Sequence, residues 1–139
     1  MTLALDAVFP QEIISGYANP TAAVGSVTGT TPTNTVLLAT ADASDGSMIT
    51  ELKATPRATA VANVLALWGS KDGGTTKQLL KQVAAPAQTV STSIAAASID
   101  FGYTIDNPLF LAPGESLYCG YMIADPASGY VFEFRGRNM

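Results

Sequence analysis

Short apolar segments alternate with turn-forming residues along most of the chain. From Thr35 onward these segments recur every 8 to 12 residues or so, a spacing roughly typical of a β-sandwich or barrel. No long segment keeps the 3.6-residue period of an amphipathic helix. We therefore predict an all-β, antiparallel fold with strands at residues 36–40, 48–54, 60–68, 77–84, 89–94, 99–105, 109–111, 117–124 and 130–135.

Glycines specify two of the connections. The tract at residues 71–74, Lys-Asp-Gly-Gly, tolerates positive φ and predicts a hairpin between the strands that flank it. The tract at residues 112–115, Ala-Pro-Gly-Glu, fits a type II turn, because proline fixes φ at the first central position and glycine takes positive φ at the second.

The alternation within strands predicts which side chains are buried. Residues 130–135 place Tyr130, Phe132 and Phe134 on one face and charged residues on the other, which indicates a half-buried strand. The segments at 63–68 and 117–123 are apolar on both faces. We expect a neighbouring subunit to cover the second face, with a loop of the same chain as the alternative.

The first 35 residues resist assignment, because prolines and glycines interrupt every apolar segment. We interpret them as an extended N-terminal arm, holding at most one short helical turn, that continues into a Thr/Gly-rich connector over residues 21–35. The predicted organisation is arm and connector at 1–35 and a β-sandwich domain at 36–139.

Composition narrows the possible chemistry. The 139 residues are 13% charged, with a net charge of −4, no histidine and one cysteine. Histidine-based catalysis, zinc clusters and an internal disulfide therefore lack their components. The scattered basic residues argue against direct nucleic-acid binding. No segment approaches the roughly 20 apolar residues of a membrane span, and Met1 to Pro10 lacks the positive start of a secretory signal, which favours the cytoplasm.

Motifs that carry chemistry are incomplete. Gly69 to Gly74 resembles half of a phosphate-binding loop but lacks its lysine, and the turn at Asp42, Asp45 and Gly46 lacks calcium ligands. Cys119 sits among apolar residues and is expected to be a buried, unreactive thiol. We predict no enzymatic activity, no catalytic residues, no cofactor and no metal. The remaining candidate is a sugar-binding platform made of aromatic side chains: Trp68, Tyr103, Tyr118, Tyr121 and Tyr130.

The order of these features resembles a known family. Asp-Gly-Ser-Met-Ile-Thr-Glu-Leu at 45–52 precedes Val-Leu-Ala-Leu-Trp at 64–68 and the 71–74 turn, and Asn-Pro-Leu-Phe-Leu-Ala-Pro-Gly-Glu-Ser-Leu-Tyr follows at 107–118. Residues 36–124 thereby resemble capsid cement or decoration proteins of tailed bacteriophages, which are small virion proteins with a jelly-roll-like β-sandwich. The resemblance implies a homodimer or homotrimer, assembled in the host cytoplasm, that binds the major capsid protein and bridges coat subunits without doing chemistry.

Contacts with such a shell are expected from residues 2–15 and 130–139. Leu3, Leu5, Phe9 and Ile13 are the predicted apolar anchors of this partner-binding surface, and Arg135 and Arg137 are the predicted charge partners of an acidic coat surface. The alternative for the C-terminal segment is that Phe132 and Phe134 are core residues and that the arginines are merely solvated.

Two other functions remain open. One is another structural component of the phage on the same sheet architecture, such as a tail, adaptor or fibre-associated protein. The other is a carbohydrate-binding β-sandwich module that uses Trp68.

Overall fold

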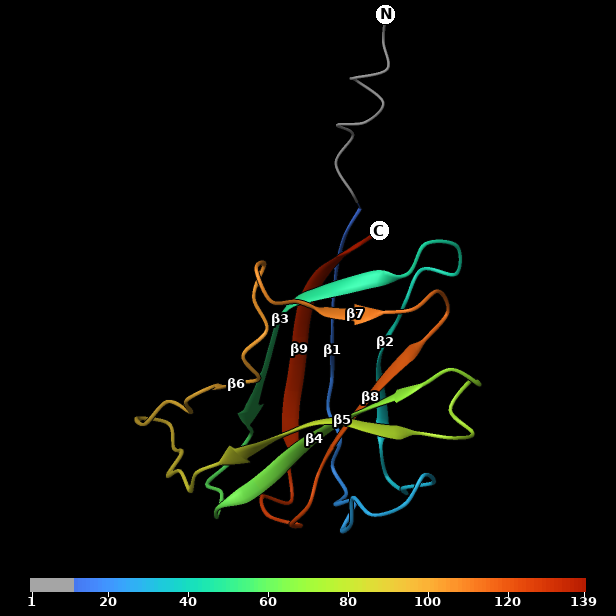
Figure 1. The fold of residues 1–139 in the computed structure, drawn as a ribbon. Helices are drawn as coiled ribbons and strands as arrows, with labels where there is room; N and C mark the ends of the chain where they lie inside the picture. Colours follow the sequence, from blue (N-terminus) through green and yellow to red (C-terminus); the bar gives the residue numbers. More distant parts are fainter. Residues whose placement is uncertain (1–11) are drawn as a thin grey trace, which may run out of the picture.

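A computed structural model of the chain describes residues 12–139, which form nine strands and no helix (Figure 1). The strands are β1 (Ile13–Ala18), β2 (Val36–Thr40), β3 (Ser47–Pro56), β4 (Asn63–Ser70), β5 (Gln78–Ala85), β6 (Ile99–Asp100), β7 (Leu109–Leu111), β8 (Ser116–Tyr121) and β9 (Tyr130–Asn138).

The strands make two antiparallel sheets with a nested order. Sheet A has the order β1-β9-β3-β6, with β7 also paired to β3, and sheet B has the order β2-β8-β4-β5. The pairs β1·β9, β2·β8, β3·β7 and β4·β5 correspond to one long antiparallel hairpin. Rolling that hairpin brings β9 against β3 and β8 against β4, which gives a jelly roll. The predicted all-β, jelly-roll-like sandwich is confirmed.

The core lies between the sheets and follows the period-two alternation of the strands. In β9, Tyr130, Phe132 and Phe134 are buried, whereas Glu133 and Arg135 are exposed, as predicted. Sheet B contributes buried leucines, and the Phe101 and Phe132 rings pack with centroids 5.9 Å apart. Phe132 and Phe134 are therefore core residues.

A loop of the same chain covers the part of the second face of sheet B that lies over β8 and Trp68. The Val24 N–H donates to the Tyr121 carbonyl at 2.8 Å, and the Lys77 N–H donates to the Thr30 carbonyl at 2.8 Å. A side chain at Gly120 would meet Val24 Cγ2 at 2.6 Å, so the missing Cβ lets the loop approach β8. The expectation that a neighbouring subunit covers this face is wrong, because the connector already buries Trp68 and Gly120.

The boundary predicted for the N-terminal arm is also wrong. Residues 13–18 form β1, pair along their whole length with β9 and contain no helical turn. Gly16, which suggested a break, is required in the strand, because a Cβ there would lie 2.8 Å from Cε1 of Phe134. The rolled sandwich thus includes residues from the predicted arm.

Two predicted strands between β5 and β7 are wrong or too long. Residues 89–94 are irregular, because the Ser91 hydroxyl accepts from the N–H groups of Ser93 and Ile94 and so closes a local turn. The strand predicted at 99–105 ends after Asp100, because Gly102 has φ of 89° and its N–H donates to the Asp100 carboxylate. Side-chain acceptors here compete with the sheet ladder.

Both predicted turns are confirmed. The hairpin between β4 and β5 has Gly73 and Gly74 at φ of 75° and 99°. At the second turn, Gly114 has φ of 76° and the Glu115 N–H donates to the Ala112 carbonyl at 2.9 Å.

Asn63 holds the connection between β8 and β9. Its buried side-chain oxygen accepts from the N–H groups of Met122 and Ile123, and its amide nitrogen donates to the carbonyls of Ile123 and Asp125. One side chain therefore satisfies the Ile123 N–H and the Asp125 carbonyl, whereas the Met122 N–H also donates to the Val64 carbonyl on β4.

We predict that Asn63→Ala lowers the free energy of unfolding by about 2–4 kcal/mol, because the Ile123 N–H and the Asp125 carbonyl lose the buried side chain that pairs with them. Urea denaturation monitored by circular dichroism measures this. Asn107→Ala, at an exposed turn position, is the matched control and should change stability by less than about 0.5 kcal/mol. Equal stabilities of the two variants would contradict the role assigned to Asn63.

Candidate interaction surface

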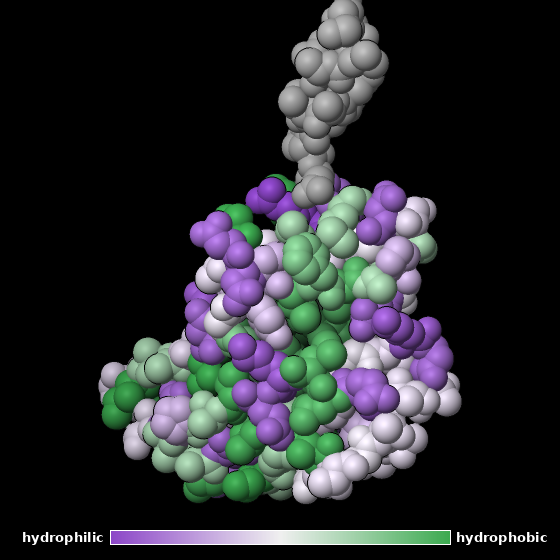
Figure 2. Space-filling model, in the orientation of Figure 1, coloured by the Kyte–Doolittle hydropathy of each residue, from purple (hydrophilic) through white to green (hydrophobic). Residues whose placement is uncertain are grey.

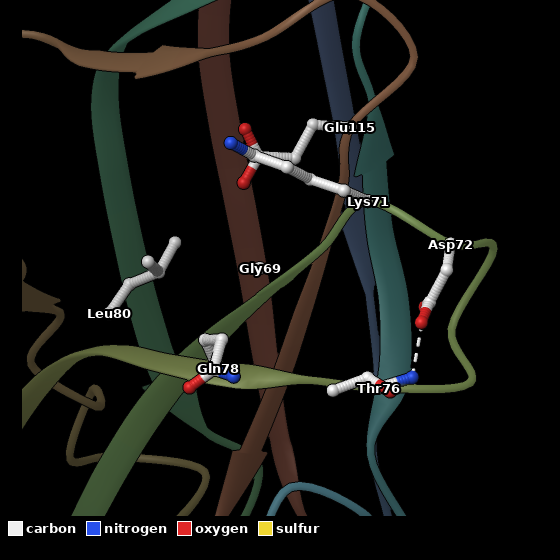
Figure 3. Close-up of a pocket in the computed structure, with 7 residues that line it drawn as sticks. All are labelled: Gly69, Lys71, Asp72, Thr76, Gln78, Leu80 and Glu115. Carbon is white, nitrogen blue, oxygen red and sulfur yellow. Dashed lines mark hydrogen bonds between the residues drawn. The ribbon is translucent and has the colours of Figure 1, made fainter.

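A hollow lies beside the β4–β5 hairpin. It measures about 480 Å³ and is lined by Gly69, Lys71, Asp72, Thr76, Gln78, Leu80 and Glu115 (Figure 3). Figure 2 shows apolar surface down the middle of the face that β4 and β5 present, and Leu79 and Leu80 of β5 are exposed.

The polar side chains of this hollow serve the turns that surround it. The Thr76 N–H and the Ser70 hydroxyl donate to Asp72, and these hydrogen bonds hold the pKa of its carboxyl below the usual value. Glu115 accepts from the Ala112 N–H at 2.9 Å. The carboxylates therefore have structural partners, and the hollow shows no pairing of a nucleophile with a base.

Three of the five aromatic side chains proposed as a sugar platform are buried, and lysine ammonium groups lie over the rings of the other two. Trp68, Tyr121 and Tyr130 are fully buried. The ammonium groups of Lys77 and Lys81 lie over the rings of Tyr118 and Tyr103, at 4.7 and 5.1 Å from their centroids. The structure thus removes the observation on which the carbohydrate-binding alternative depended.

Cys119 is buried in the core, as expected. Its thiol lies 3.6 Å from the carbonyl oxygen of Val36, and burial raises its pKa. A thiol held in its neutral form is a poor nucleophile, so Cys119 acts as a small core side chain.

The connector packs on the second face of sheet B, whereas the corresponding face of sheet A is open to solvent. We call it the outer face of sheet A; its side chains alternate with the core residues and form rows across the strands. The first row is Ile13, Arg137, Met48 and Phe110; the second is Ser15, Arg135 and Glu51; the third is Tyr17, Glu133, Lys53 and Asp100.

Large apolar side chains stand exposed on this face. Ile13, Tyr17 and Phe110 are 82%, 79% and 61% exposed. Isolated exposed apolar residues are common, but several on one flat sheet indicate a contact surface. The outer face of sheet A is therefore the best candidate functional site in the described residues.

The structure brings together three of the six predicted partner-binding residues. Ile13 is the register partner of Arg137, and Ser15 is the register partner of Arg135, so both arginines flank β1 on the outer face. Neither arginine forms an ion pair with any residue in the range 12–139. Leu3, Leu5 and Phe9 lie outside the described residues.

Sequence reasoning missed Tyr17, Met48 and Phe110 as members of this surface. The alternation in β9 did indicate that Glu133 and Arg135 share a face. The neighbours of that face come from β1, β3 and β7, and only the strand order and register reveal them.

Comparisons with known proteins assign no function to the chain. The chain matches no protein family, no curated protein and no solved structure. Within residues 12–139 there is no helix capable of crossing a membrane and no cluster of side chains suited to a metal ion.

The burial of Trp68 can be measured by fluorescence, because it is the only tryptophan in the chain. We predict that its fluorescence resists quenching by iodide in the folded protein and becomes quenched on unfolding in guanidinium. Monosaccharides should leave the emission unchanged. Quenching of the folded protein as strong as that of free N-acetyltryptophanamide would contradict the burial of Trp68 beneath the connector.

Proposed function

We propose that the chain is a non-enzymatic virion structural protein that binds the outer surface of a tailed-phage capsid and stabilises it by bridging coat subunits. The observation that carries the proposal is the pairing of β1 with β9, which joins the two predicted contact segments at one end of the outer face of sheet A. A jelly roll alone implies no function. The surface chemistry supports contact with macromolecules, and the sequence resemblance supplies the class of partner.

The described parts of the two predicted contact segments lie side by side. Residues 2–15 and 130–139 were expected to make these contacts, and β1 pairs with β9 over six register positions. The Asn138 N–H donates to the Glu12 carbonyl at 2.9 Å, which fixes where the segment carrying Leu3, Leu5 and Phe9 joins the sheet. The three apolar anchors are thus covalently attached at one end of the open face.

Binding energy explains how such a protein stabilises a shell. A molecule that binds adjacent coat subunits only when they are assembled shifts the equilibrium toward the assembled shell by mass action. Many identical copies on one particle multiply modest individual contacts. No chemical step is needed, in agreement with the structural roles of the polar groups around the hollow and of Cys119.

Deletion of residues 2–11 tests this proposal, because it removes three anchors but keeps β1. Purified particles of the parent virus would first be searched for the chain by mass spectrometry. Heads stripped of it would then be mixed with the full chain or the truncated chain and pelleted. Loss of three apolar contacts, each contributing about 1.5 kcal/mol or more when buried, should weaken binding more than about tenfold.

The matched control is Ile94→Ser, which removes an exposed apolar side chain from a loop remote from β1 in sequence. This variant should bind heads as the full chain does. Absence of the chain from purified particles, or undiminished binding after the deletion, would refute the proposal or its assignment of the anchors.

A further inference from the structure

The outer face of sheet A is electrically mixed. Arg137 and Arg135 occupy the first and second rows, and Glu133 and Asp100 occupy the third. Lys53 of the third row forms an ion pair with Glu51 of the second row at 3.6 Å. An acidic coat surface, the partner expected for the arginines, would be attracted to one end of the face and repelled by the other.

Over β1 and β9 this pattern is complementary to itself. A two-fold axis can lie in the plane between two such faces and run across the strands along the row of Ser15 and Arg135. Rotation about this axis places the first row of one copy opposite the third row of the other. Arg137 then lies opposite Glu133 of the second copy, and Glu133 lies opposite its Arg137. The same rotation sets Ile13 opposite Tyr17, so the two most exposed apolar side chains cover each other.

We propose that the outer face of sheet A binds the same face of a second copy of this chain through this two-fold contact. Ion pairs between Arg137 and Glu133 form twice, once on each side of the axis. Sheets pack face to face with their strands within about 30° of each other, which keeps corresponding rows in register near the axis. A closed two-fold contact uses one surface patch on both partners and leaves no unpaired patch behind.

The central row is compatible with this arrangement. Ser15 is small and uncharged, and Arg135 approaches its own copy close to the axis. Glu51 is the register partner of Arg135 on β3, so each copy brings a negative charge into the same row, which reduces the repulsion between the two arginines. Across the three rows, each copy carries three basic and three acidic side chains.

The contact is modest in size. It covers part of a single sheet face. The smallest specific interfaces bury about 1,200 Å² in total, and we expect this contact to be of that size. We therefore expect a dimer that dissociates on dilution. This inference goes beyond the proposed function and stands without it, because dimerisation is measured on the isolated chain.

Sedimentation equilibrium of the full chain over a wide concentration range tests the contact. The wild-type chain should show a monomer–dimer equilibrium. Arg137→Glu and Glu133→Arg should each weaken dimerisation by about tenfold or more, because each places like charges opposite one another at two positions. The double variant, R137E with E133R, should restore the dimer, since the exchange rebuilds both ion pairs in the opposite sense.

Two further variants separate the contact from general effects. Lys71→Glu makes the same change of charge in the β4–β5 hairpin and should leave dimerisation unchanged. Ile13→Ser removes an apolar contact without altering charge and should also weaken the dimer. Thermal unfolding of each variant, which should match that of the wild type, verifies the fold.

The inference is overturned if the wild-type chain is monomeric at every concentration, if Arg137→Glu behaves like Lys71→Glu, or if the double variant fails to restore the dimer. These outcomes concern the isolated chain. If the chain is monomeric but binds phage heads, only this inference is overturned. If the chain dimerises but does not bind phage heads, only the proposed function is overturned.

Discussion

The pairing of β9 with both β1 and β3 determines the rest of the molecule. Inward side chains of β9, Tyr130, Phe132 and Phe134, supply much of the core, and its outward side chains supply the charges of the open face. A slip of one residue in either register would exchange these two sets. Hydrophobic burial of the three aromatic residues therefore also fixes which arginines and glutamates face outward.

This constraint explains which features were predictable from the sequence. Strands with local signals were found: β2 and β7 match their predicted bounds, and both glycine turns lie where their residues place them. β1 was missed because Gly16 and the flanking prolines weaken its local signal, whereas its partners on β9 are more than a hundred residues away. Serine side chains that close their own turn made residues 89–94 irregular despite their apolar content.

Some residues of the candidate site were predictable from the sequence, whereas others became apparent only from the pairing of distant strands. Ile13, Arg135 and Arg137 were selected from the two ends of the chain, and the sheet brings them together. The remaining members come from β1, β3 and β7, where a single exposed tyrosine, methionine or phenylalanine carries no signal by itself. Trp68 was selected as a sugar-binding residue but is buried. The connector that packs over it was assigned to a region outside the sandwich domain, so no signal in the sequence indicated this burial.

The account rests on one claim, that this protein acts through the contacts of its surfaces and that sheet A provides one of them. Cryo-electron microscopy of the intact parent particle tests it most directly. The account predicts jelly-roll density on the outer capsid surface, with the outer faces of sheet A from two copies buried against each other. Density elsewhere in the particle, or a sheet A face open to solvent in every copy, would contradict it.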